Sequence, residues 1–173
     1  HFADVDVAES CTGSTSLHAA ATGVHWKCLD LLLGAKASVN QLQTSDRSTA
    51  LLAAAQKGHV EAVDALLRAR TAVNWPRNDG VSALHMACKN KNKQADKVVY
   101  TLLLAKAEVN GHATNNPHLD TPLCEAAKRG QLNVVRMLLE AMADVNLSSP
   151  LDAASCSGHV EVVQMLLACK AIQ

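Results

Sequence analysis

Large aromatic side chains are scarce in this sequence. They make up 2% of its 173 residues, namely Phe2, Trp26, Trp75 and Tyr100, although 49% of all residues are hydrophobic. A single globular core of this size would normally use more large rings, because each of them buries so much surface. A core built mainly from Ala and Leu instead indicates thin layers of closely packed helices.

An excess of charge of either sign is also missing. Sixteen Lys and Arg residues balance sixteen Asp and Glu residues, so the formal net charge is zero. This balance argues against a general attraction to nucleic acid or to an anionic membrane, and we expect neither as a partner. No run of about 18 apolar residues occurs, so no membrane span is expected in this segment, and no secretory signal is visible.

The six cysteines form no CxxC pair and none has zinc-ligand spacing with a histidine. Their distribution predicts reduced thiols and a protein of the cytoplasm or nucleus. By their register, Cys28 and Cys88 are expected in the core as inert small hydrophobes, and Cys11 and Cys156 on the surface. No metal and no cofactor is expected.

The dominant feature is an internal repeat. A Val-Asn pair, or Val-Asp in its first copy, ends at residues 6, 40, 74, 110 and 146, at intervals of 34, 34, 36 and 36 residues. A Leu-rich block precedes each later copy, an Ala-rich block lies further upstream, and Gly58, Gly130 and Gly158 follow three of the Ala-rich blocks. Such a period predicts a solenoid of supersecondary units.

Each unit reads as two short helices. The Ala-rich segment forms the first, which a glycine in the left-handed conformation ends in three units. The Leu-rich segment forms the second, with apolar residues at helical spacing. Helices this short are marginal alone, so stacking of the units must bury their apolar faces.

These residues resemble the ankyrin repeat, whose signature includes T-P-L-H-x-A. The matching stretches begin at Thr15, Thr49, Ser82, Thr121 and Ser149, and AKASVN, ARTAVN, AKAEVN and AMADVN resemble the family's repeat ending. The resemblance implies an all-α ankyrin-repeat solenoid of stacked helix-turn-helix units with short β-hairpin finger loops. We expect one array over residues 1–173, with repeats at about 7–40, 41–74, 75–110, 111–146 and 147–173. The last repeat is expected to be truncated, and residues 1–6 are expected to be the tail of a preceding repeat. The native array is therefore expected to be longer.

The chain departs from the family pattern in several places. Lys36, Arg70, Lys106 and Met142 replace a family glycine at a position that favours positive φ. Repeat three has about three extra residues around 91–95, and a similar insertion lies at 114–117. Before repeat five only residues 147 and 148 remain where a finger is expected, so that finger is either short or missing.

The resemblance implies a protein-binding scaffold rather than an enzyme, with its partner on the concave face that fingers and first helices form. Carried over by register, the candidate partner-binding residues are Asp46, Arg47, Gln56, Lys57, Trp75, Arg77, Asn78, Asp79, Lys89, Asn90, His118, Asp120, Lys128 and Arg129. An alternative is that the array is the regulatory or targeting segment of a larger multidomain enzyme or channel. We expect a monomer.

A basic stripe at the ends of the first helices, formed by Lys57, Lys89, Lys128 and Arg129, favours an acidic partner protein or peptide. Alternatively, these cations only offset the helix dipoles. Trp75 is either an exposed hot spot or packed against a neighbouring finger.

Other residues of the repeat are expected to have structural roles. His18 and His85 are expected to brace the first helices rather than to catalyse a reaction, because no nucleophile or acid is arranged around them. Trp26 is expected in structural packing. Asn40, Asn74, Asn110 and Asn146 are expected to brace backbone turns.

Overall fold

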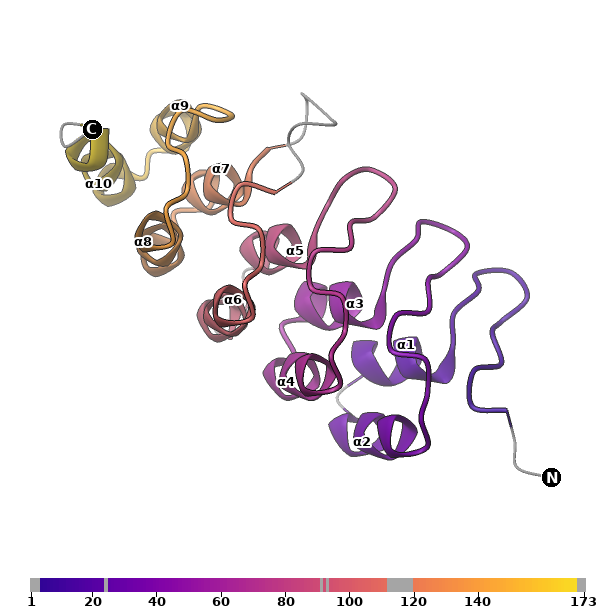
Figure 1. Ribbon diagram of the computed structural model, residues 1–173. Coiled ribbons are helices and arrows are strands. Elements are labelled where there is room, and N and C mark those ends of the chain that lie inside the picture. Colours follow the sequence, from indigo (N-terminus) through magenta and orange to yellow (C-terminus); the bar gives the residue numbers. More distant parts are fainter. Residues whose placement is uncertain (1–3, 24, 91, 93, 112–119, 171–173) are drawn as a thin grey trace.

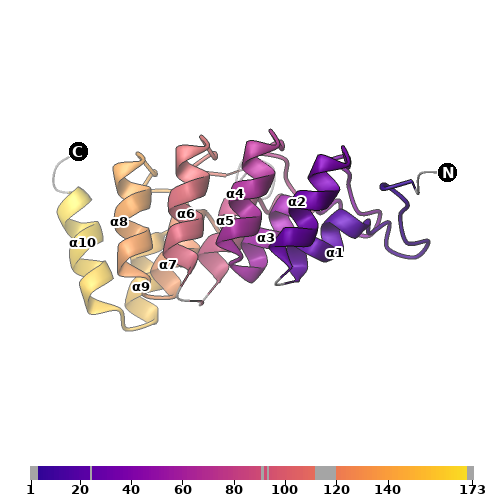
Figure 2. The same cartoon turned by 90° about the horizontal axis from the view of Figure 1, so that it is seen from below.

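The computed structural model describes residues 4–23, 25–90, 92, 94–111 and 120–170, and these contain ten α-helices. They are α1 (Ser16–Thr22), α2 (Trp26–Gly34), α3 (Ala50–Lys57), α4 (Val60–Arg68), α5 (Ala83–Lys89), α6 (Ala95–Leu104), α7 (Pro122–Lys128), α8 (Leu132–Glu140), α9 (Pro150–Cys156) and α10 (Val160–Lys170). Odd-numbered helices pack side by side in one row and even-numbered helices in a second row (Figures 1 and 2). The predicted stack of helix pairs is confirmed, and repeats one to five below denote the pairs α1–α2 to α9–α10.

Hydroxyl side chains begin most of the first helices. Thr49 Oγ1 accepts a hydrogen bond from the backbone N–H of Leu52 at 3.3 Å, which satisfies a donor that the helix leaves unpaired. In α5 the bond is reciprocal: Ser82 Oγ accepts from the His85 N–H, and His85 Nδ1 accepts from the Ser82 N–H at 3.2 Å. A histidine thus takes the place of the usual Glu or Gln of a capping box, and the predicted bracing role is confirmed.

The ends of the first helices follow the glycine prediction. Gly58, Gly130 and Gly158 have φ values of 74°, 68° and 74°, which is the left-handed region. A Cβ added to Gly58 would lie 2.7 Å from Nδ2 of Asn90, which donates a hydrogen bond to the Gln56 carbonyl at 3.0 Å. Glycine at this position therefore also lets repeat three approach repeat two.

The second helices end in a turn that normally requires glycine. In repeat one, the N–H of Lys36 donates to the Leu33 carbonyl and the N–H of Ala37 donates to the Leu32 carbonyl, both at 3.0 Å. This pair of hydrogen bonds is the Schellman motif. The left-handed residues of the four such turns are Lys36, Arg70, Lys106 and Met142, with φ between 60° and 65°. The predicted positive φ is confirmed.

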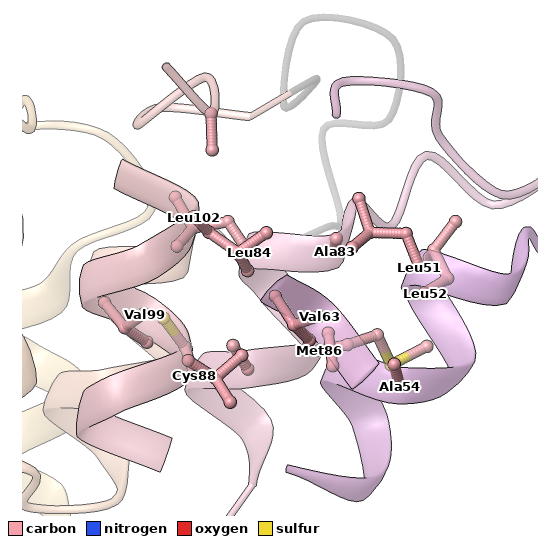
Figure 3. Close-up of a cluster of buried hydrophobic side chains, with 14 of the residues drawn as sticks. Leu51, Leu52, Ala54, Val63, Ala83, Leu84, Met86, Cys88, Val99 and Leu102 are labelled. Atoms are coloured by element: carbon pink, nitrogen blue, oxygen red, sulfur yellow. The ribbon is translucent and has the colours of Figure 1, made fainter. Parts of the chain in front are cut away.

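Small and branched aliphatic side chains fill the core. One leucine of each first helix in repeats one to four is 1% exposed, and Ala54, Ala87 and Ala126 are fully buried. Figure 3 shows Met86 of α5 beside Ala54 of α3, and Leu84 of α5 beside Leu102 of α6. None of the buried side chains in the described residues is a Phe, Trp or Tyr, so the core has the thin, ring-poor layers that the composition predicts.

Side-chain amides connect consecutive repeats. Asn40 Oδ1 accepts a hydrogen bond from the backbone N–H of Ala72 at 2.8 Å. The equivalent bond in other repeats is accepted by the side chains of Asp6, Asn74 and Asn110. The acceptors and donors are Asp6–Ser38, Asn40–Ala72, Asn74–Glu108 and Asn110–Asp144. The predicted bracing is confirmed for Asn40, Asn74 and Asn110, and the turn that each one braces belongs to the next repeat.

The residue after the glycine forms a second connection to the preceding repeat. His59 Nε2 lies 3.1 Å from the Thr22 carbonyl, and His159 Nε2 lies 3.2 Å from the Lys128 carbonyl. Gln131 replaces histidine between them and donates to the Asn90 carbonyl at 2.5 Å. Repeats two, three and four are therefore each bonded to their predecessor at both ends of their helices, with Asn90 in this role in repeat three.

The fingers are hairpin-like loops, and the part of the chain that the structure describes contains one isolated β-bridge, between Ala8 and Thr15, and no regular strand. One backbone bond closes each of the first three fingers, for example Gln43 N–H to Ser48 O at 3.0 Å. Before α9 the finger is short: Ser148 and Ser149 both adopt positive φ and lead directly into Pro150.

Two expectations about packing are wrong. Trp26 is 44% exposed, with the Lys27 ammonium 5.7 Å from its ring centroid. Cys28 is exposed, whereas Cys88 is buried as expected. Both Trp26 and Cys28 lie on α2, at the end of the array where the structure stacks no further helix on repeat one. The insertion at 114–117 lies outside the described residues.

Candidate partner-binding surface

Backbone hydrogen bonds tie the fingers to one another. The N–H of Thr44 in the second finger donates to the Thr12 carbonyl of the first at 2.9 Å. The N–H of Asn78 in the third finger donates to the Asp46 carbonyl of the second at 3.0 Å. The three fingers therefore form one connected ribbon beside the first helices (Figure 1), and the side chains on it keep a fixed spacing.

An ion network reinforces the ribbon between the second and third fingers. The Arg77 guanidinium binds the carboxylate of Asp79 in its own finger and lies 3.6 Å from the carboxylate of Asp46 in the preceding one. The hydrogen bond to Asp79 raises the pKa of Arg77, and the same bond lowers the pKa of Asp79. Three of the predicted partner-binding residues thus hold the fingers together, and one guanidinium faces two carboxylates, so the group keeps a net negative charge.

Other finger residues remain available. Arg47 and Asn78 are exposed, and Arg47 adopts a φ of 62° at the tip of its finger. The Trp75 side chain is 38% exposed, so more than half of it is packed while one part of the ring faces solvent. Trp75 is therefore partly packed, and its role as a hot spot stays a prediction, since a partly held ring loses little entropy when a partner covers it.

The helix-end cations have different surroundings. Glu125 of α7 is 6% exposed, and its carboxylate lies 3.3 Å from Lys89 Nζ of α5 and 3.2 Å from Nη2 of Arg129. Lys128 Nζ lies 3.8 Å from the Asp120 carboxylate. Two of the four cations thus neutralise a buried carboxylate, which would be costly to bury without them.

Sequence reasoning missed Glu125. Its register position holds Ala53 in repeat two and Met86 in repeat three, which are 8% and 6% exposed. A charged residue at a position that is apolar in the neighbouring repeats was the available signal. It indicates that partners for the carboxylate must come from the adjacent helix ends.

Of the four helix-end cations, Lys57 and Lys128 are the two that do not neutralise Glu125. Lys57 is exposed and has no ion pair in the described part of the chain, and the Lys128 side chain is 57% exposed. Gln56 is exposed beside Lys57, while the side-chain amide of Asn90 donates a hydrogen bond to the Gln56 carbonyl. His118 lies outside the described residues. The preference for an acidic partner stays a prediction.

A hollow of about 290 Å³ opens where the finger before α9 is short. Asp120, Cys124, Lys128, Asp152 and Cys156 are among the residues that line it. The Cys124 thiol donates to the Ser148 carbonyl at 3.0 Å, and burial raises the pKa of this thiol to about 12. Cys124 is therefore protonated at neutral pH and is not a nucleophile.

His18 is equally unsuited to catalysis. Its Nδ1 lies 2.9 Å from Thr15 Oγ1 and its Nε2 lies 3.2 Å from the Ser48 carbonyl. Burial lowers the pKa of His18, although hydrogen bonds to backbone carbonyls oppose the shift. The ring is a neutral structural connector between repeat one and the second finger.

Comparison with known proteins agrees with this architecture. A family model described as ankyrin repeats in three copies matches residues 17–113 and 93–173. The chain belongs to the ankyrin-repeat family. Ankyrin arrays are in general non-catalytic modules that bind other proteins, and none of the helices described here is both long and apolar enough to cross a membrane.

Two individual ankyrin proteins are similar to this array. The crystal structure of the human ASB11 ankyrin repeat domain superposes with a TM-score of 0.77 at 29% identity, covering 90% of this chain and 69% of that domain. The Drosophila melanogaster ankyrin repeat and KH domain-containing protein mask is 38% identical over 69 residues, which is 40% of this chain. The match spans 2% of the length of mask.

Proposed function

We propose that this array binds a partner protein on the face formed by the linked fingers and the ends of the first helices. The observation that carries the proposal is the connected finger ribbon, which presents Arg47, Asn78 and part of Trp75 beside the exposed Lys57 and Lys128. A pre-ordered surface loses little conformational entropy on binding, which favours affinity. Neither metal nor cofactor has a role in this function.

The partner that fits the exposed lysines carries acidic side chains at the matching positions. Such charges at the rim of an interface act mainly on the association rate. Binding should therefore weaken as salt rises, because the Debye length falls from about 10 Å at 0.1 M to about 3 Å at 1 M. The reduced thiols support a location in the cytoplasm or nucleus, and we propose that the free chain is a monomer.

The test is affinity capture from lysate with identification by mass spectrometry, using the wild-type chain and two folded variants. The surface variant carries Trp75→Ala, Lys57→Glu and Lys128→Glu, and leaves the cations that neutralise Glu125 intact. The matched control makes the same kinds of change on the second helices, with Tyr100→Ala, Lys97→Glu and Arg136→Glu, all at exposed positions.

A protein captured by wild type and control but lost from the surface variant would support the proposal. Circular dichroism and the unfolding midpoint must be equal for the three proteins, so that loss of binding is not loss of fold. Proteins that are lost only from the control would place the binding surface on the second helices and would refute the finger-side assignment.

The second candidate function is that of a regulatory or targeting segment within a larger protein. The similarity to mask favours it, because the matching 69 residues are 2% of a much longer chain whose name also includes a KH domain. Sequencing the full transcript decides this point, since a catalytic or membrane domain encoded with the array would establish it.

A further inference from the structure

The five repeats supply an internal comparison of exposure at each register position. Cys28 and Leu32 on α2 correspond to Ala62 and Leu66 on α4, which are 1% and 0% exposed. The corresponding residues of α6, α8 and α10 are equally buried, at no more than 1% exposed: Val98, Leu102, Val134, Leu138, Val162 and Leu166. In repeat one, Cys28 is exposed and Leu32 is half-buried.

The first helices show the same difference. Ser16 and Ala19 of α1 are exposed, whereas the residues in their register in α3 and α5 are at most 8% exposed, namely Ala50, Ala53, Ala83 and Met86. Those residues are buried because the preceding repeat stacks on them, as the contacts between α1 and α3 and between α3 and α5 show. The outer face of repeat one has the side chains of a stacking face without a neighbour on it.

This outer face forms an open apolar groove. A hollow of about 530 Å³ is lined by Ser16, Ala19, Ala20, His25, Cys28, Leu31 and Leu32. Leu31 is 75% exposed, which is a large apolar exposure for a residue whose register partner Ala65 is 6% exposed. Concentrated apolar exposure of this kind marks a surface that another element covers.

The segment before the first finger identifies the element. Asp6 Oδ1 accepts from the Ser38 N–H at 2.9 Å, which is the bond that Asn40, Asn74 and Asn110 make from the tail of one repeat to the tail of the next. Residues 4–6 thus already occupy the tail position of a repeat that lies before repeat one. The helices that belong to such a tail would lie over α1 and α2.

The opposite end of the array has different side chains. Asp152 and Ser155 of α9 are exposed. Their register partners are at most 2% exposed in every other first helix, for example Leu52 and Ala55 of α3. The polar side chains His18 and His85 are buried in the register of Asp152 with hydrogen-bond partners, whereas a carboxylate without a partner is costly to bury. This polar end would bury Asp152 if it stacked on the apolar groove, so it is a poor occupant for the groove of a second copy.

We propose that the groove of repeat one is a docking surface for the helix pair of one further ankyrin-type repeat, in register with residues 4–6 as its tail. The interface repeats the contacts that already join α1 to α3 and α2 to α4. Cys28, Leu31 and Leu32 become buried in it.

The test supplies the missing helix pair from the chain itself. A copy of residues 41–71 is fused directly ahead of residue 4, because residue 71 has the register of residue 3. The fusion should add helical circular dichroism and raise the thermal unfolding midpoint by at least about 5 °C, since it buries several apolar side chains. Absence of the rise would overturn the proposal.

Matched variants separate docking from a general effect of a longer chain. Leu31→Glu and Cys28→Glu change exposed positions, so the 173-residue chain should keep its midpoint within about 2 °C. In the fusion, the same changes should remove most of the gain, because they bury a carboxylate without a partner. A gain that survives both changes refutes docking at the groove.

Sedimentation equilibrium of the unfused chain addresses the competing occupant. The expected mass is that of the 18.3 kDa monomer. A dimer that Leu31→Glu converts to monomer would show that a second copy covers the groove, and would overturn the assignment to a further repeat.

Discussion

Replacing the four left-handed residues at the ends of the second helices by glycine should stabilise the array. Each of Lys36, Arg70, Lys106 and Met142 holds a φ between 60° and 65°. The Cβ of an L-residue in this conformation costs about 1–2 kcal/mol, whereas glycine costs about 0.5–1 kcal/mol more than alanine in lost chain entropy. The net gain is therefore about 0.5–1 kcal/mol at each site.

Little else is lost in these changes, because the four side chains are exposed and Met142 is 83% exposed. The sites lie in different repeats and share no partner, so their effects should add to about 2–4 kcal/mol for the quadruple variant. At about 2–4 °C per kcal/mol for a chain of this size, the unfolding midpoint should rise by roughly 4–16 °C. Urea unfolding of each single variant and of the quadruple variant measures the gain.

The controls are the corresponding alanine variants. Alanine removes the long side chain but keeps the Cβ and its strain, so each alanine variant should unfold within about 0.5 kcal/mol of the wild type. If alanine stabilised the protein as much as glycine does, the gain would come from the deleted side chain. If glycine gave no gain, the assigned backbone strain would be absent, and either result refutes the reasoning.

Three further predictions concern single groups in the core and at the surface. Glu125→Gln should destabilise the fold by about 1–3 kcal/mol in urea unfolding, since it leaves two half-buried cations uncompensated; a destabilisation below about 0.3 kcal/mol would show that the ion pairs contribute nothing. Burial lowers the pKa of His18 in the folded state, so the unfolded state binds more protons below about pH 6.5. Stability should therefore fall as the pH drops from 6.5 toward the lowered pKa. The variant His18→Leu should make the free energy of unfolding depend less on pH, and an unchanged dependence would show that other groups cause it. A thiol reagent at neutral pH should modify the three exposed cysteines first, with Cys88 and Cys124 protected until unfolding, and early labelling of either buried thiol by peptide mass spectrometry would contradict the packing.

The repeat made most of the fold predictable. Its period, its glycine positions and its Val-Asn pairs placed the helix pairs, and the four residues that replace the family glycine indicated the positive φ of the turns. The sequence could not show that Asn40 and its equivalents bond to the following repeat, because spacing along one repeat does not say which neighbour an amide faces.

The candidate surface was less predictable, because its chemistry depends on contacts between repeats. Lys89 and Arg129 looked like free cations in the sequence, and the buried carboxylate of Glu125 lies between them only after α5 and α7 pack together. The expectation for Cys28 was wrong for the same reason: its register is buried only where a preceding repeat covers it. The local sequence pattern determines the register of a residue, whereas its exposure depends on whether a neighbouring repeat covers it.

The amide bonds from one repeat tail to the next have a consequence for how such a chain can evolve. Each of the four junctions in the described residues uses the same acceptor position and the same backbone donor, so a duplicated or deleted unit of whole repeats meets a compatible partner on both sides. Gene rearrangements that preserve the phase can thus lengthen or shorten the binding surface in steps of one unit. Rearrangements that break the phase would leave these side chains without the matching backbone donor, and the junction would lose this connection.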